Sequence, residues 1–177
     1  MGEDLPAFGW RRRQRVRDDR QHHRACASAQ CRGGQKDGDE AIGRSRGGLS
    51  TKIHATVDAL GNPTGFALSP GQAHDLEGAD ALLPDLAADV LIADKAFDAE
   101  ERVLKPLEEA GKTAVIPPKG NRKEPRPYDK HLYKARHLIE NFFAKLKQFR
   151  AIATRYDKTA RCFLAGIHLA AIAIWLN

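Results

Sequence analysis

The sequence lacks the features of secreted, membrane-spanning and disulfide-stabilised proteins. It has three cysteines, Cys26, Cys31 and Cys162, an odd count that argues against a disulfide framework and predicts a reducing, cytoplasmic location. Its first twenty residues are polar and rich in arginine, unlike a secretion signal. The longest apolar run, 162–176, is shorter than the ~20 residues of a membrane helix and contains His168. We therefore expect a buried closing helix and no membrane partner.

The composition that remains predicts one basic α/β domain. A chain of 177 residues, 42% of them hydrophobic, is long enough for a single core and too short to assume two. Lysine and arginine number 29 against 23 acidic residues, so the net charge is +6 and the pI about 9.4. This balance favours a polyanionic partner, with nucleic acid as the first candidate.

The chain divides into an N-terminal arm and a patterned remainder. Residues 1–47 are basic and have almost no apolar periodicity, which predicts a disordered or irregular arm, whereas residues 48–177 carry the signals of an ordered domain. Alternating strands and helices imply a mainly parallel layered sheet, in which sites lie at the C-terminal strand ends. The expected elements are a hairpin (51–57 and 64–68), a helix entered at Asp75 that runs to 83 or 86, a strand (90–93), a helix (100–110) ended by Gly111, a strand (113–116), a basic loop (119–130), a helix (133–147) and the closing helix.

The helix expected at 133–147 has one face that carries chemistry. Advancing about 100° per residue from Tyr133 places Arg136, Glu140 and Lys147 within about 60° of it. The ordinary explanation is a solvated face with charges spaced i, i+4. The opposite stripe is apolar and can dock on a core; it comprises Ala135, Ile139, Phe142 and Leu146.

Asp94 and Glu140 are the candidate metal-binding and catalytic acids. Asp94 ends the apolar strand 90–93, and Glu140 lies on the helix face beside cationic side chains. Magnesium or manganese prefers hard oxygen ligands and keeps open positions for water and phosphate. Carboxylates among arginine and lysine therefore suit phosphoryl transfer, in which two such ions can clamp the attacking and leaving oxygens.

Four motifs then resemble the bacterial insertion-sequence transposases of the DDE type, close to family five. They are GRSRGGLSTKIHATVDALGNP, SPGQAHD, LIADKAFD and Y-x2-R-x3-E-x6-K, the last filled by Tyr133, Arg136, Glu140 and Lys147. The resemblance covers about residues 33–177 and implies a ribonuclease-H-like mixed sheet with flanking helices. It implies that Asp94 is the second metal-binding Asp and Glu140 the closing Glu, with Mg2+ or Mn2+ as cofactor and double-stranded DNA, both transposon ends and target, as partner. Tyr133, Arg136 and Lys147 would position transposon-end DNA, and a homodimer is left open.

The resemblance fails at the first catalytic Asp, which the family carries in an upstream strand like DSTIVRAH. Asp18, Asp19 and Asp58 are the nearby acids, and none fits the pattern. Residues 17–32 can be encoded by codons that, when the reading frame is shifted by one nucleotide, encode the peptide D-S-T-I-V-R-A-H instead. We therefore hypothesise that the segment before about Gly33 is out of frame. The fold would then lack its first central strand, and the chain alone would have little or no strand-transfer activity.

Three other interpretations remain. The first is a non-catalytic DNA-binding protein, which would bind DNA without cutting it. Its contacts would be Arg136, Lys145, Lys147, Arg150, Arg155 and Arg161. A nuclease on the same scaffold is the second, although the Tyr-Arg-Glu-Lys face favours a transposase. The third is a small zinc site made by His22, His23, Cys26 and Cys31, whose spacing is not a common structural one. His74 and Asp75 match a family-like stretch and are expected to serve the entry of a helix.

Overall fold

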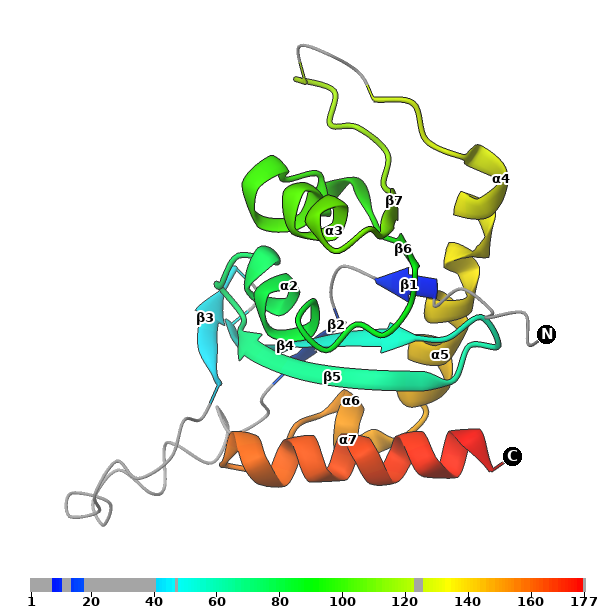
Figure 1. Ribbon diagram of the computed structural model, residues 1–177. Helices are drawn as coiled ribbons and strands as arrows, with labels where there is room; N and C mark the ends of the chain where they lie inside the picture. The colour runs from blue at the N-terminus through cyan, green and yellow to red at the C-terminus, as the bar shows by residue number, and fades with distance from the viewer. Residues whose placement is uncertain (1–7, 11–13, 18–40, 47, 123–125, 177) are drawn as a thin grey trace.

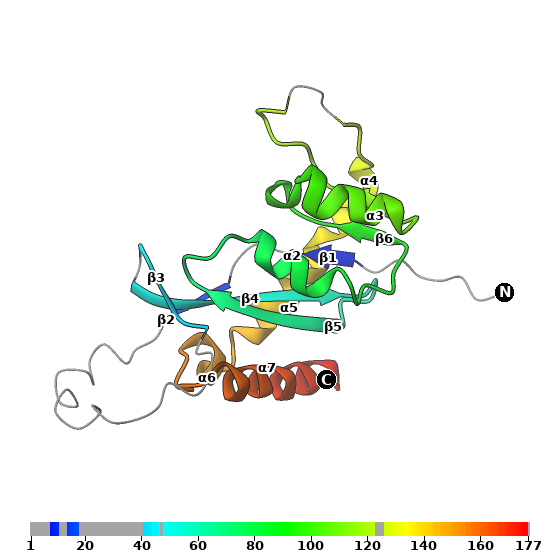
Figure 2. The same ribbon diagram turned by 60° about the vertical axis from the view of Figure 1, so that its left-hand side comes forward.

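A long antiparallel hairpin is the centre of the fold (Figures 1 and 2). The computed structural model describes residues 8–10, 14–17, 41–46, 48–122 and 126–176. The elements, in chain order, are β1 (Phe8–Trp10), β2 (Gln14–Arg17), β3 (Gly43–Ser45), β4 (Gly48–Val57), β5 (Pro63–Pro70), α2 (Leu76–Leu82), β6 (Val90–Ile92), the 3-10 turn η2 (Lys95–Phe97), the π-helical turn η3 (Glu100–Leu104), α3 (Lys105–Glu109), β7 (Thr113–Val115), α4 (Lys130–Tyr133), the 3-10 turn η4 (Lys134–Arg136), α5 (His137–Leu146), α6 (Arg150–Ala153) and α7 (Ala160–Trp175). The arrangement confirms a mixed α/β fold. The expectation of a mainly parallel sheet is wrong, because β1, β2, β3 and β5 all pair antiparallel with β4, and among the described strands only β6 and β7 are parallel.

Strand β4 is buried on both faces and separates two layers of helices. Ile53, Ala55 and Val57 point into the core beneath α5 and α7. The alternate residues face α2, where the Lys52 ammonium is 2.8 Å from the Asp75 carboxylate and both side chains are only 5% exposed. Helix α2 comes this close because Gly78 lacks a Cβ, which would lie 2.2 Å from the His54 ring. The hairpin is confirmed, and it has a buried polar side that alternation alone did not predict.

Two short strands from the N-terminal arm pair with the free edge of β4. Since Ile53 is in register with both Gln14 and Leu68, β2 and β5 lie on opposite edges of β4. Strand β1 pairs antiparallel with β4 on the edge shared with β2 and also lies beside β6 (Figure 1). The position expected to lack a strand thus holds a short one. Residues 1–7, 11–13, 18–40 and 47 of the arm, among them the four residues of the zinc interpretation, lie outside the described residues.

Strands β6 and β7 form the predicted parallel pair, with Val90 opposite Thr113 and Ile92 opposite Val115. The helix expected between them over 100–110 consists of η3 followed by α3. Pro106 has no N–H to donate and stands at the first turn of α3, where this costs least. Gly111 ends the helix with a φ of 69°, as predicted. Together, η3 and α3 cover one side of the β6–β7 pair and connect the end of β6 to the start of β7.

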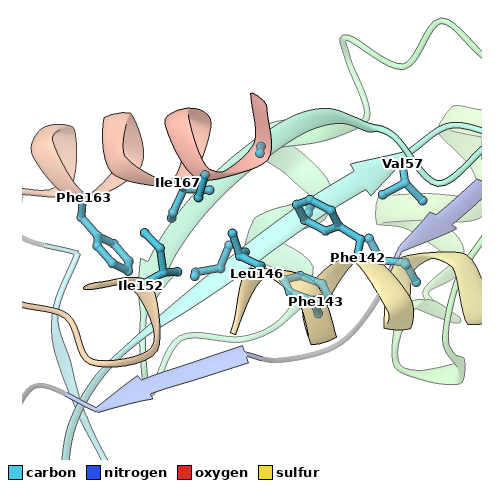
Figure 3. Close-up of a cluster of buried hydrophobic side chains, with 12 residues drawn as sticks. Val57, Phe142, Phe143, Leu146, Ile152, Phe163 and Ile167 are labelled. Carbon is cyan, nitrogen blue, oxygen red and sulfur yellow. The ribbon is translucent and has the colours of Figure 1, made fainter. Parts of the chain in front are cut away.

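Helices α5, α6 and α7 close the core on the other side of the hairpin (Figure 3). Phe142, Phe143 and Leu146 of α5 meet Phe163 and Ile167 of α7 in this cluster. The predicted burial of Ile139, Phe142 and Leu146 is confirmed, and Ala135 is partly buried.

The expected closing helix, α7, is buried on one face only. Leu169, Ile172 and Trp175 on its outer face are 69%, 50% and 65% exposed. Within the described part of the chain, no helix is long and apolar enough to span a membrane.

Candidate active site

Asp94 lies just beyond the C-terminal end of β6, where side chains converge in a parallel sheet. The chain is extended at Asp94 and then turns into η2, so the carboxylate projects from the strand end. Its side chain is 19% exposed, which leaves it accessible while the backbone around it is buried. The predicted position of Asp94 at a strand end is confirmed.

Tyr133 and Arg136 contact Asp94, and Glu140 contacts Arg136, although the helix that carries these three residues is not continuous. The segment expected as one α-helix comprises α4, η4 and α5. A 3-10 turn has about three residues per turn, so it aligns Tyr133 with Arg136 more closely than an α-helix would. The α-helix that follows then sets Glu140 one turn beyond Arg136, only about 40° from it.

Arg136 joins the two acids. Its Nη1 donates to Asp94 Oδ1 at 2.9 Å, and its Nη2 lies 2.8 Å from Glu140 Oε1. The guanidinium also lies over the Tyr133 ring, 5.7 Å from its centre. Asp94 and Glu140, on different elements, thus both contact the Arg136 guanidinium.

A pocket of about 420 Å3 opens beside Asp94 and is lined by Lys95, Pro117 and two tyrosines. The rings of Tyr128 and Tyr133 are edge to face at 5.5 Å. The Tyr133 hydroxyl donates to Asp94 Oδ1 at 3.4 Å. Burial raises the pKa of Tyr133, Arg136 opposes this and the Asp94 charge adds to it, so the hydroxyl keeps its proton at neutral pH.

The two acids fit a divalent cation by their chemistry. Asp94 and Glu140 offer hard carboxylate oxygens around a point that already accommodates positive charge. No third acid, histidine or cysteine joins them among the residues that the structure describes. Asp58 does not substitute, because its Oδ1 accepts from the backbone N–H groups of Leu60 and Asn62 and so closes the hairpin turn. Asp18 and Asp19 lie outside the described residues.

The cations predicted to bind DNA do not share one surface. Lys147 is exposed at the end of α5, on the Glu140 face, seven residues further along the helix. Lys145 lines a groove with the hairpin loop and Trp175 instead. Arg150 and Arg161 are exposed on α6 and α7. The predicted basic surface is therefore split between the acid site and the helical layer below the sheet.

Arg155 requires a correction, since it is only 1% exposed and cannot contact a DNA backbone. It bonds to the Thr51 hydroxyl, donates from Nε to the carbonyl of Asp157 at 3.0 Å, and stacks on Phe163 at 4.7 Å. These contacts tie the chain before α7 to β4. Arg155 is thus a structural residue of the core.

Asp98 is a residue beside the site that the motifs did not single out. Its carboxylate, 2% exposed, accepts from the backbone N–H of Lys119 at 2.8 Å and pairs with Arg122. It therefore fixes the loop after β7, which supplies the Pro117 wall of the pocket. The sequence signal was an acid four residues after Asp94 in LIADKAFD, with no local sign of its partner.

His74 and Asp75 lie away from the acids and serve the entry of α2, as predicted. His74 Nδ1 accepts from the backbone N–H of Leu76 at 3.2 Å. Asp75 occupies the cap position, but its side chain makes no capping bond and pairs with Lys52 instead. The family-like SPGQAHD stretch thus anchors a helix to β4.

The structure defines an α/β domain whose paired carboxylates lie at the end of a parallel strand among cationic side chains, an arrangement that can handle phosphate groups with a divalent metal. The family described as "Transposase DDE domain" matches residues 15–176. The chain belongs to this family, which implies dependence on a divalent metal in general. It is 40% identical over 130 residues to a protein of Brucella ovis described as "Putative transposase for insertion sequence element IS6501". That alignment covers 73% of this chain and all of the relative. No solved structure matches the chain.

Proposed function

We propose that this chain carries two of the three acids of a DDE site for cleavage and transfer of DNA strands, and that alone it binds DNA without cutting it. The observation that supports this most is the meeting of Asp94 and Glu140 at one guanidinium. The lack of a third acid near them in the described part of the chain favours the binding-only outcome. A chain that keeps its phosphate contacts and loses one metal ligand would behave in this way.

Each side chain has a role in the proposal. Asp94 and Glu140 would hold Mg2+ or Mn2+, which when bound neutralises phosphate charge and activates the attacking oxygen. Tyr133 keeps Asp94 oriented through its hydroxyl. Arg136 and Lys147 would bind phosphates of the transposon end, since both lie on the face that carries Glu140. Lys145, Arg150 and Arg161 would contact the same duplex or the target further away.

A DNA-cleavage assay tests the catalytic half of the proposal. The purified chain is incubated with a duplex of its own transposon end and Mg2+ or Mn2+. No strand cleavage is expected. Cleavage that is abolished by Asp94→Ala and by Glu140→Ala would show that the chain is active without a further acid, and would refute the proposed inactivity.

A binding assay tests the other half. Affinity for the duplex should fall with salt, with a slope of about −0.9 for each phosphate neutralised, and should survive Glu140→Ala. Arg161→Ala and Lys147→Ala should each lower the slope by about one phosphate. If a variant that combines Arg161→Ala and Lys147→Ala binds the duplex like the parent chain, these two cations are not part of the DNA interface.

The nucleotide sequence tests the origin of the missing acid. We propose that another reading frame across residues 17–32 encodes a DSTIVRAH-like strand. A frameshifted fusion, or a product of the upstream frame, would then restore cleavage when supplied to this chain. An overlapping frame without such a strand would rule out this explanation.

A further inference from the structure

The contact that joins Asp94, Arg136 and Glu140 has a consequence for how metal and DNA bind. Arg136 uses both terminal nitrogens, one on each acid, and its side chain is 26% exposed. The Asp94 and Glu140 side chains are 19% and 32% exposed. The cluster is therefore open enough for exchange, and Arg136 compensates one of its two negative charges without a metal.

Arg136 contacts Oδ1 of Asp94 and Oε1 of Glu140. A divalent cation that bridges the acids through these two oxygens competes with the guanidinium for them. Once displaced, Arg136 needs a new anionic partner. A DNA phosphate on the same face can provide one, because guanidinium binds phosphate in the same forked geometry as carboxylate.

We infer that Arg136 is an exchangeable counter-ion, which occupies the acid pair in the DNA-free protein and passes to a DNA phosphate when a divalent metal binds. The inference rests on the proposed metal-dependent function. Binding of metal and DNA is then positively coupled, since metal frees Arg136 for phosphate and phosphate removes the competitor of the metal. By linkage, each ligand raises the affinity of the other by the same factor.

Manganese titration of the DNA-free protein, followed by the electron paramagnetic resonance of free Mn2+, tests the exchange. Arg136→Gln should bind Mn2+ about tenfold more tightly than the parent chain, as expected for loss of one charge at hydrogen-bond distance in a half-exposed site. Lys134→Gln is the matched control. It removes the same charge from the same turn, from an exposed side chain, and should stay within about twofold of the parent chain.

The titration separates two kinds of failure. If Asp94→Asn abolishes Mn2+ binding but Arg136→Gln does not tighten it, the metal site exists and the exchange is wrong. If neither the parent chain nor Arg136→Gln binds Mn2+ in a manner that depends on Asp94, the metal-dependent function itself is wrong, and the inference fails with it.

A second measurement keeps the test independent of any distortion in the variant. The salt dependence of duplex binding is compared with and without saturating Mn2+, by fluorescence anisotropy. In saturating Mn2+, the parent chain and Lys134→Gln should each gain about one phosphate contact. Their slopes of log affinity against log salt concentration should therefore become steeper by about 0.9 than the slope of Arg136→Gln at the same Mn2+ concentration. Equal changes in all three proteins would overturn the transfer of Arg136 to DNA.

Discussion

Replacement of Arg155 by Ala should destabilise the protein by about 3–5 kcal/mol. The side chain is 1% exposed and bonds to the Thr51 hydroxyl and to the carbonyls of Asp157 and Lys158. A hydrogen bond from a charged donor contributes about 1.5–3 kcal/mol, and stacking of a desolvated cation on Phe163 about 2 kcal/mol. The cost of desolvating the guanidinium offsets part of this sum, which leaves the stated range.

Urea unfolding followed by circular dichroism at 222 nm measures this effect. With a slope of roughly 2 kcal/mol per molar urea for a domain of this size, Arg155→Ala should lower the midpoint by roughly 2 M. Arg155→Lys should fall between, because an ammonium keeps the charge but cannot reproduce the planar fork.

Arg161→Ala is the matched control, since Arg161 is exposed on α7. It should change stability by less than about 0.5 kcal/mol, and is expected to weaken DNA binding instead. If Arg155→Ala shifts the midpoint no further than Arg161→Ala, the structural role assigned to Arg155 is wrong.

Two further predictions concern buried polar groups. Burial lowers the pKa of His54 from 6.5 to about 4, so the unfolded state binds the proton first and stability falls as pH drops from about 6.5 to 4. This loss should reach about 3 kcal/mol and be largely absent in His54→Gln, as measured by urea unfolding across that range; equal pH profiles would contradict it. Asp98→Asn should cost about 2 kcal/mol and speed amide exchange at Lys119, because asparagine keeps one acceptor oxygen and cannot accept from both the Lys119 N–H and Arg122. Glu100→Gln, whose side chain is 49% exposed in the same ion-pair network, should do neither, so equal effects of the two variants would count against the anchoring role.

Much of the scaffold could be predicted from local patterns. Alternation in TKIHATV and the break at Gly61 specify the hairpin, because side chains on a strand point to opposite faces in turn. The run ending at Asp94 predicted a buried strand with an acid at its end. These signals succeed because they depend on neighbours within a few residues.

The buried polar contacts could not be predicted in this way, because each depends on a partner far along the chain. Lys52 looks like a surface residue of a strand until Asp75 is placed over it by α2. Arg155 lies in a basic segment whose composition suggests a DNA contact, and only the fold buries it against Phe163. The break of the helix at η4 was missed because an apolar pattern with helical spacing does not distinguish a single 3-10 turn from an α-helical one.

The completeness of the acid site depends on one edge of β4. Strand β1 holds the place beside β6 at that edge, and its residues, Phe8, Gly9 and Trp10, include no carboxylate. Asp58, at the end of β4, has its carboxylate committed to the hairpin turn. A third acid for Asp94 and Glu140 must therefore come from outside the described residues or from another polypeptide. If a strand carries it, that strand must pair with the edge that β1 now occupies, because β5 covers the other edge of β4. Restoring catalysis would then require β1 to leave the sheet, so complementation by such a strand and the present pairing of β1 with β4 are mutually exclusive.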